Sequence, residues 1–123
     1  MEAGAAQRME EEVERLLSDA LGDMVRLNVA LFFHDHPSFV DGAQRIASRL
    51  GRDQAVVERA LKALADCGVV ERFQLGSGRY VLYAYTENAK VRRAVAQLSR
   101  HFHTDPAMRT AIVRRVMGLR DRE

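Results

Sequence analysis

The segment from Asp41 to Phe73, DGAQRIASRLGRDQAVVERALKALADCGVVERF, constrains the fold of this chain more than any other part. Apolar residues recur at helical spacing in two short runs on either side of Gly51, a residue type that supplies the positive φ of a sharp helix exit. Asp41 and Asp53 stand where the N-caps of these runs are expected, and Gly68 ends the second run. The segment therefore predicts two helices joined by a tight turn and followed by a strand.

A β-hairpin is expected directly after these helices. Two runs rich in β-branched and aromatic residues, VVERFQL and RYVLYAYT, flank the turn sequence GSG. Alternation along the second run places Tyr83 and Tyr85 toward the core, and Tyr80 and Leu82 on the opposite face.

Two helices are expected ahead of the central segment. Residues 7–23 carry an apolar stripe at helical spacing, with charged residues between the apolar ones. Gly22 and Asp23 interrupt the pattern. Residues 24–36 are apolar on nearly all sides, which predicts a buried helix that ends before Pro37.

Two more helices are expected after the hairpin. Thr86 is the predicted N-cap of a helix over residues 87–103, and Asp105 with Pro106 opens the last helix. The chain is thus predicted to be a single domain over residues 1–123, mainly α-helical with a small β-hairpin (α+β).

The middle of the chain, residues 24–86, resembles a winged helix-turn-helix of the superfamily that includes MarR-like and ArsR-like bacterial regulators. The resemblance rests on IASRLGRDQAVVERALKALADCGVVER, with an Ile-Ala pair in the first helix, Leu-Gly at the turn and Glu-Arg at the entry to the hairpin, or wing. It covers about half of the chain. It implies a transcriptional regulator that binds double-stranded DNA, with the second helix in the major groove and the wing on the minor groove or backbone.

The resemblance and the outward positions of these elements define candidate DNA-binding residues. Gln54 is suited to adenine and Arg59 to guanine or phosphate, while an arginine at the wing is suited to a narrow minor groove. Residues of these types are also common on any solvent-exposed helix face, so the alternative is that they are ordinary surface residues. The candidates are Arg45, Arg49, Arg52, Gln54, Glu58, Arg59, Lys62, Ser77 and Arg79.

Glu58 fits this set poorly, because a carboxylate repels phosphate. It can accept a hydrogen bond from cytosine N4, orient Arg59, or form an ion pair with Lys62 four residues later. We expect the ion pair with Lys62. Glu58 also favours an alternative function, a winged-helix protein-interaction module that binds no DNA.

Charge is distributed unevenly along the chain, although the net charge is only +2. Residues 1–24 carry two basic and seven acidic side chains, whereas residues 87–123 carry nine basic and four acidic ones. The two ends are expected to attract each other, within one chain or between two. The alternatives are a basic end that touches phosphate, or two solvated helix faces.

A homodimer is expected, because a small winged domain has little surface to bury the stripes of both flanking segments, residues 7–23 and 87–121. In the regulators that the chain resembles, helices outside the winged core form a two-fold dimer, and a dimer spaces two recognition helices about one DNA turn apart. The alternative is that these helices cover the winged core of their own chain. The candidate interface residues are Val13, Leu16, Leu17, Leu21, Met108, Ile112, Val116 and Leu119.

A metal- or redox-sensing regulator is a further alternative. The histidines come in two pairs, His34 with His36 and His101 with His103, but a spacing of two residues does not converge on one helix face. We therefore expect no metal site and no cofactor. Cys67, the sole cysteine, lies beside an aspartate and is expected to be buried filler.

An enzyme is not expected, since the glycines of GSG belong to a hairpin turn and no catalytic set has support from its context. No apolar run approaches the roughly 20 residues of a membrane span. The N-terminus lacks the basic start and apolar middle of a secretory signal. These features predict a cytoplasmic protein, and they leave open an unidentified small-molecule effector or protein partner.

Overall fold

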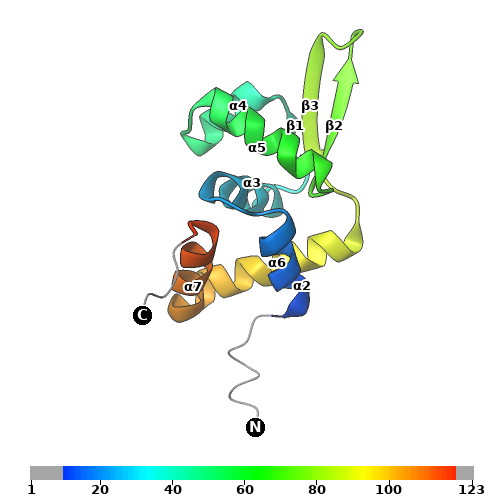
Figure 1. Cartoon of the computed structure of the whole chain (residues 1–123). Coiled ribbons are helices and arrows are strands. Elements are labelled where there is room, and N and C mark those ends of the chain that lie inside the picture. Colours follow the sequence, from blue (N-terminus) through cyan, green and yellow to red (C-terminus); the bar gives the residue numbers. More distant parts are fainter. Residues whose placement is uncertain (1–9, 119–123) are drawn as a thin grey trace.

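The computed structural model describes residues 10–118, which form six helices and one three-stranded antiparallel sheet (Figure 1). The predicted class, mainly helical with a small amount of β-structure, is confirmed. The helices are α2 (Glu11–Asp19), α3 (Met24–Asp35), α4 (Ala43–Leu50), α5 (Gln54–Asp66), α6 (Ala89–Thr104) and α7 (Pro106–Val116). The strands are β1 (Val40–Asp41), β2 (Val70–Leu75) and β3 (Tyr80–Tyr85).

The sheet contains one strand more than the predicted hairpin, with the order β1-β3-β2. Val40 pairs with Ala84 and Asp41 pairs with Tyr83. Two residues are too few to display an alternating pattern, so this strand could not be seen in the sequence. The predicted N-cap of α4 is also wrong, because Asp41 lies in β1 and the cap is Gly42.

The turn between α4 and α5 forms as predicted. Gly51 has a φ of 67°, in the left-handed region, and lets α4 end within one residue. Asp53 then caps α5, its Oδ2 accepting a hydrogen bond of 3.3 Å from the backbone N–H of Val56. Ile46 of α4 and Leu61 of α5 are fully buried, so the pair of helices is held at a fixed angle by packing as well as by the turn.

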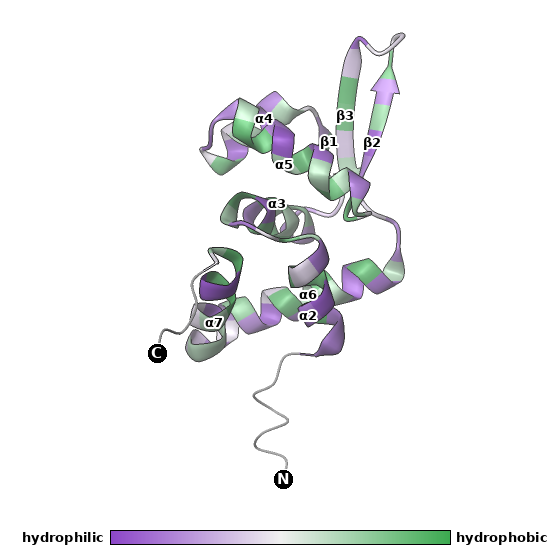
Figure 2. Cartoon of the chain, viewed as in Figure 1, coloured by the Kyte–Doolittle hydropathy of each residue, from purple (hydrophilic) through white to green (hydrophobic). Residues whose placement is uncertain are grey.

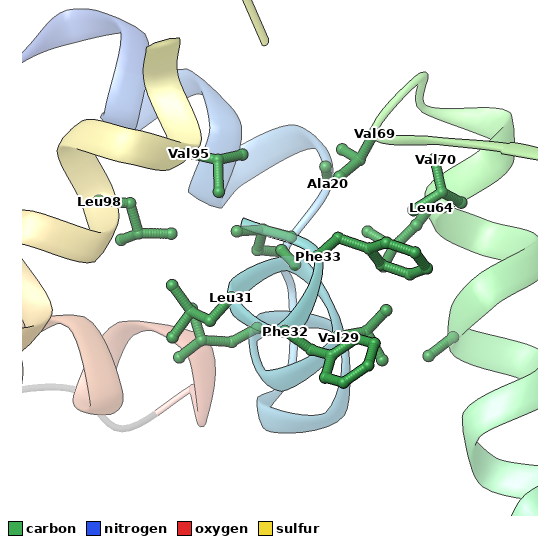
Figure 3. Packing of buried hydrophobic residues seen from close by; sticks show 14 of the residues in the cluster. Ala20, Val29, Leu31, Phe32, Phe33, Leu64, Val69, Val70, Val95 and Leu98 are labelled. Atoms are coloured by element: carbon green, nitrogen blue, oxygen red, sulfur yellow. The ribbon is translucent and has the colours of Figure 1, made fainter. Parts of the chain in front are cut away.

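Helix α3 is the centre of the molecule. It packs against α5 on one side and against α6 on the other, and Figure 3 shows its side chains filling the space between them. Leu27, Val29 and Phe33 are completely buried, which explains why the sequence of this helix is apolar on nearly all sides. The helix ends before Pro37, as predicted.

Helices α2, α6 and α7 form a second layer below α3 (Figure 1). The apolar stripes of α2 and α7 are buried within this single chain, so they are core residues. The sequence-based argument for a homodimer, that these stripes lack a covering surface, therefore does not hold for them. The buried residues are Val13, Leu16, Leu17, Leu21, Met108, Ile112 and Val116. Leu119 and the outer parts of the predicted flanking segments, at residues 7–9 and 119–121, lie outside the described residues.

Opposite charges tie α2 to the C-terminal helices. Glu10 Oε1 lies 2.8 Å from His101 Nε2, and this hydrogen bond is the main reason that the pKa of Glu10 falls below its usual range. Glu12 lies 4.0 Å from Arg93, and Glu14 pairs with Arg115. The expected attraction between the acidic and basic ends is thus confirmed within one chain.

The start of α6 differs from the prediction. Asn88, not Thr86, is its N-cap, and the Asn88 side chain accepts hydrogen bonds from the backbone N–H groups of Lys90 and Val91. Thr86 is buried two residues earlier, where its hydroxyl accepts a hydrogen bond of 3.1 Å from Asn88 N–H.

Within the described part of the chain, no helix has the length and apolar character needed to span a bilayer.

Candidate nucleic-acid interface

A groove of about 760 Å³ runs between the two helices of the helix-turn-helix and the wing. Gln54 and Glu58 line it from α5, since residues four apart lie on the same face of a helix. Arg45 and Ser48 line it from α4, and Arg79 lines it from the wing, just before β3. The structure therefore brings four of the predicted DNA-binding residues, with Ser48 in addition, into one concave surface.

The charges in this groove nearly cancel. Arg45 Nε lies 3.6 Å from Asp41 Oδ2, so part of its positive charge is already neutralised. Arg79 and Glu58 form no ion pair with any residue in the range 10–118. The expected ion pair between Glu58 and Lys62 is thus wrong: spacing permits it, but Glu58 lines the groove and Lys62 does not.

Arg49 and Arg52 lie elsewhere. Both line a second groove of about 570 Å³, which is formed by α3, the α4–α5 turn and the end of α6. Arg52 donates hydrogen bonds of 2.6 and 3.1 Å to Asn28 Oδ1, and the Arg49 guanidinium lies 5.1 Å from the centre of the Phe39 ring. These contacts hold both side chains against α3 and its following loop, so neither residue lines the groove beside the wing.

The remaining predicted residues are exposed. Arg59 and Lys62 lie on the solvent side of α5 and form no ion pair among residues 10–118. Ser77 is at the tip of the wing, where it adopts a φ of 59° between two glycines that also have positive φ. All three are available to a partner. Of the three, only Ser77 belongs to the wing, which forms one side of the groove.

One feature of the wing was not recognised from the sequence. The hairpin register pairs Phe73 with Leu82 and Leu75 with Tyr80, and cross-strand partners lie on the same face of a sheet. Phe73, Leu75 and Tyr80 are 43%, 50% and 60% exposed, and the hydrophobic segments of the wing are visible in Figure 2. The alternation of apolar residues along both strands was the available signal. Tyr83 and Tyr85 are buried on the other face, as predicted.

The histidines and the cysteine lie away from this interface. Cys67 is exposed, so the expectation of buried filler is wrong; it follows the last turn of α5, and its thiol donates a hydrogen bond of 3.3 Å to the Asp19 carbonyl. His101 contacts Glu10, as described above. Among residues 10–118 there is no group of three or more His, Cys, Asp or Glu side chains that could hold a metal ion.

Comparison with known proteins identifies similar folds. A possible transcriptional regulator from Methanosarcina mazei Go1 matches with a TM-score of 0.54 and 22% identity, over 80% of this chain and 86% of that chain. The crystal structure of RV1404 from Mycobacterium tuberculosis matches with a TM-score of 0.53 and 19% identity, over 89% of this chain and 69% of that chain. No protein-family model and no curated protein matches the sequence. At these identities the matches concern the fold, and the predicted winged helix-turn-helix is confirmed.

Proposed function

We propose that the protein is a cytoplasmic transcriptional regulator that binds double-stranded DNA in a sequence-specific manner. The observation that carries the proposal is the groove between α5 and the wing. It brings together Gln54, Arg45 and Arg79, side chains of types that can hydrogen-bond to bases or phosphates, at the place where a winged helix meets DNA. The similarity of the fold to a possible transcriptional regulator supports the same function.

In this mechanism α5 enters the major groove. Gln54 and Glu58, which line the concave side, meet base edges, while the exposed cations Arg59 and Lys62 meet the backbone or a flanking base. Arg79 lies across the groove from α5, so it contacts the minor groove or the phosphates beside the wing. Arg49 and Arg52 support the turn from behind and are assigned no base contact.

The regulator is proposed to act as a homodimer, because two recognition helices one DNA turn apart read a longer site than one helix. Since the stripes of α2 and α7 are covered within one chain, a second copy would meet the outer surfaces of the same helices. Met117, at the end of α7, is 55% exposed and is an apolar group on that side. The mass of the protein in solution tests this part of the proposal: a monomer at all concentrations would contradict it.

A small-molecule effector is also part of the proposal. A cavity of about 230 Å³ lies where α2, the α5–β2 turn and α6 meet, and its floor includes Leu16, Val69 and Val91. A small apolar compound in this cavity would contact both the helical layer and the end of the recognition helix. Binding of such a compound would thereby favour one packing arrangement of the helical layer against the recognition helix.

The proposal is tested by the binding of a pool of random and genomic duplex fragments at several salt concentrations. We expect specific binding that weakens as salt rises, and an affinity loss of about 1–3 kcal/mol for Arg59→Ala if Arg59 contacts a base. Arg93→Ala is the matched control, because Arg93 pairs with Glu12 in the helical layer. The absence of binding at about 50 mM salt, where phosphate contacts are strong, would contradict the proposal.

The second candidate function is a protein-interaction module. It is favoured by the apolar face of the wing, formed by Phe73, Leu75 and Tyr80, and by Glu58, which has no ion-pair partner among residues 10–118 and lies in an almost neutral groove. Phe73→Ser separates the two functions. A DNA-binding regulator retains most of its affinity for duplex DNA in this variant, because Phe73 does not line the groove.

A further inference from the structure

We propose that Glu58 is the residue that selects cytosine in the DNA site of this protein. The inference rests on the proposed function and names a base that the groove recognises. Glu58 lies one helical turn after Gln54, on the concave side of α5. Both side chains lie on the surface that enters the major groove.

The carboxylate of Glu58 accepts no hydrogen bond from another residue in the range 10–118. Among residues 10–118, neither Arg59 nor Lys62 forms an ion pair with it, and Arg45, which lines the groove from α4, is paired with Asp41 at 3.6 Å. Glu58 is half-buried, so the groove wall restricts the conformations that its side chain can adopt. A carboxylate with free lone pairs in a groove recognises a group that donates hydrogen bonds.

The chemistry of DNA narrows the choice of donor. Phosphates are excluded, because they are anionic acceptors. On the major-groove edge the amino donors are cytosine N4 and adenine N6, and adenine presents the acceptor N7 beside its amino group. A carboxylate has only acceptors to offer, so N7 repels it, whereas cytosine has no acceptor at that edge. Cytosine is therefore the base that Glu58 fits best.

The assignment also explains the charge balance of the groove. Glu58 lowers the affinity for every phosphate nearby, which is a cost if its role is to bind DNA of any sequence. The same negative charge weakens binding to sites that lack the cytosine amino group. Discrimination between sites thus increases through the penalty on incorrect sites as well as through the contact with the correct one.

The test compares wild-type protein with Glu58→Ala and Glu58→Gln. Preferred sites are first selected from randomised duplexes with the wild-type protein, and each base pair of the best site is then substituted in turn. At one position we expect cytosine to be preferred about tenfold or more over other bases. Glu58→Ala should remove this preference at that position alone, and Glu58→Gln should move it to adenine, whose N6 and N7 match a side-chain amide.

Asp66→Ala is the matched control, because it removes one negative charge from the exposed end of the same helix without touching the groove. It should retain the wild-type base preference. The inference is overturned if Glu58→Ala keeps the cytosine preference, or if it raises the affinity for all sequences equally, which would indicate repulsion alone. If no variant binds any duplex at about 50 mM salt, the proposed function fails, and the inference fails with it.

Discussion

The two layers of this molecule use their charged residues in different ways. In the helical layer, acids of α2 face bases of α6 and α7, and Glu10, Glu12 and Glu14 each have a basic partner. In the winged layer, Glu58 and Arg79 form no ion pair among the residues that the structure describes. The difference indicates which charges belong to the fold and which are available to another molecule.

The physical reason is whether each charge is paired with another residue or solvated by water in the isolated chain. A surface ion pair contributes only about 0–1 kcal/mol, but several pairs that join α2 to α6 and α7 restrict how these helices move relative to each other. An unpaired charge in a groove is solvated by water until a partner with a complementary group displaces that water. The ion pairs of the helical layer therefore support the fold, and the winged layer is the part that we propose to bind DNA.

The largest expected effect comes from the helical layer. Val13 is fully buried, so Val13→Asp places an unpaired charge in the core and should lower the free energy of unfolding by about 3 kcal/mol or more. Thermal denaturation of the variant measures this loss. Arg15→Asp, on the exposed side of the same helix, should change the melting temperature little. A folded Val13→Asp chain that differs only in its state of association would show that the stripe is an interface after all.

A smaller effect is expected at the turn. Arg52→Ala removes the two hydrogen bonds to Asn28 and should cost about 1 kcal/mol of stability. The double variant with Asn28→Ala should cost little more than either single change, because both remove the same contact. Denaturant titration of the four proteins gives the coupling energy. Additive losses would mean that Arg52 and Asn28 do not interact in solution.

The smallest effect concerns acid pH. The pKa of Glu10 is lowered by the hydrogen bond with His101, so this pair stabilises the fold above the unfolded-state pKa of about 4.5 and loses its contribution as the pH falls through the lower folded pKa. Glu10→Gln should reduce stability by less than about 1 kcal/mol at pH 6, and by progressively less as the pH falls below about 4.5. Melting curves across this range measure the change. Glu11→Gln, at an exposed position beside Glu10, is the matched control.

Local features of the sequence predicted local structure well. Gly51 and Asp53 determine the turn through the backbone conformation and hydrogen bond that they themselves form, so their roles were visible without any tertiary information. Helix α3 was recognised because apolar residues on every face require burial on every face. The same reasoning did not distinguish Thr86 from Asn88 as a cap, since both residue types accept the same hydrogen bond.

Contacts between distant segments could not be predicted in this way. The stripes of α2 and α7 were recognised as apolar, but their spacing says nothing about whether the covering surface belongs to the same chain or to another. Arg49 and Arg52 are both cationic and close in sequence, as expected for residues that bind phosphate. The packing of the turn on α3, which directs them away from the wing, is visible only in the structure. Glu58 and Lys62 have the spacing of an ion pair, but Glu58 lines the groove and Lys62 does not, and the pair does not form.

The salt dependence of DNA binding tests the difference between the layers most directly. The slope of log affinity against log salt should become shallower by about 1 for Arg59→Ala or Arg79→Ala if the substituted arginine meets a phosphate, because one phosphate contact is then lost. Arg93→Ala and Arg52→Ala should leave the slope unchanged, since these arginines are occupied by Glu12 and Asn28. Equal slopes for all four variants, or an effect confined to the paired arginines, would contradict the division of roles between the two layers.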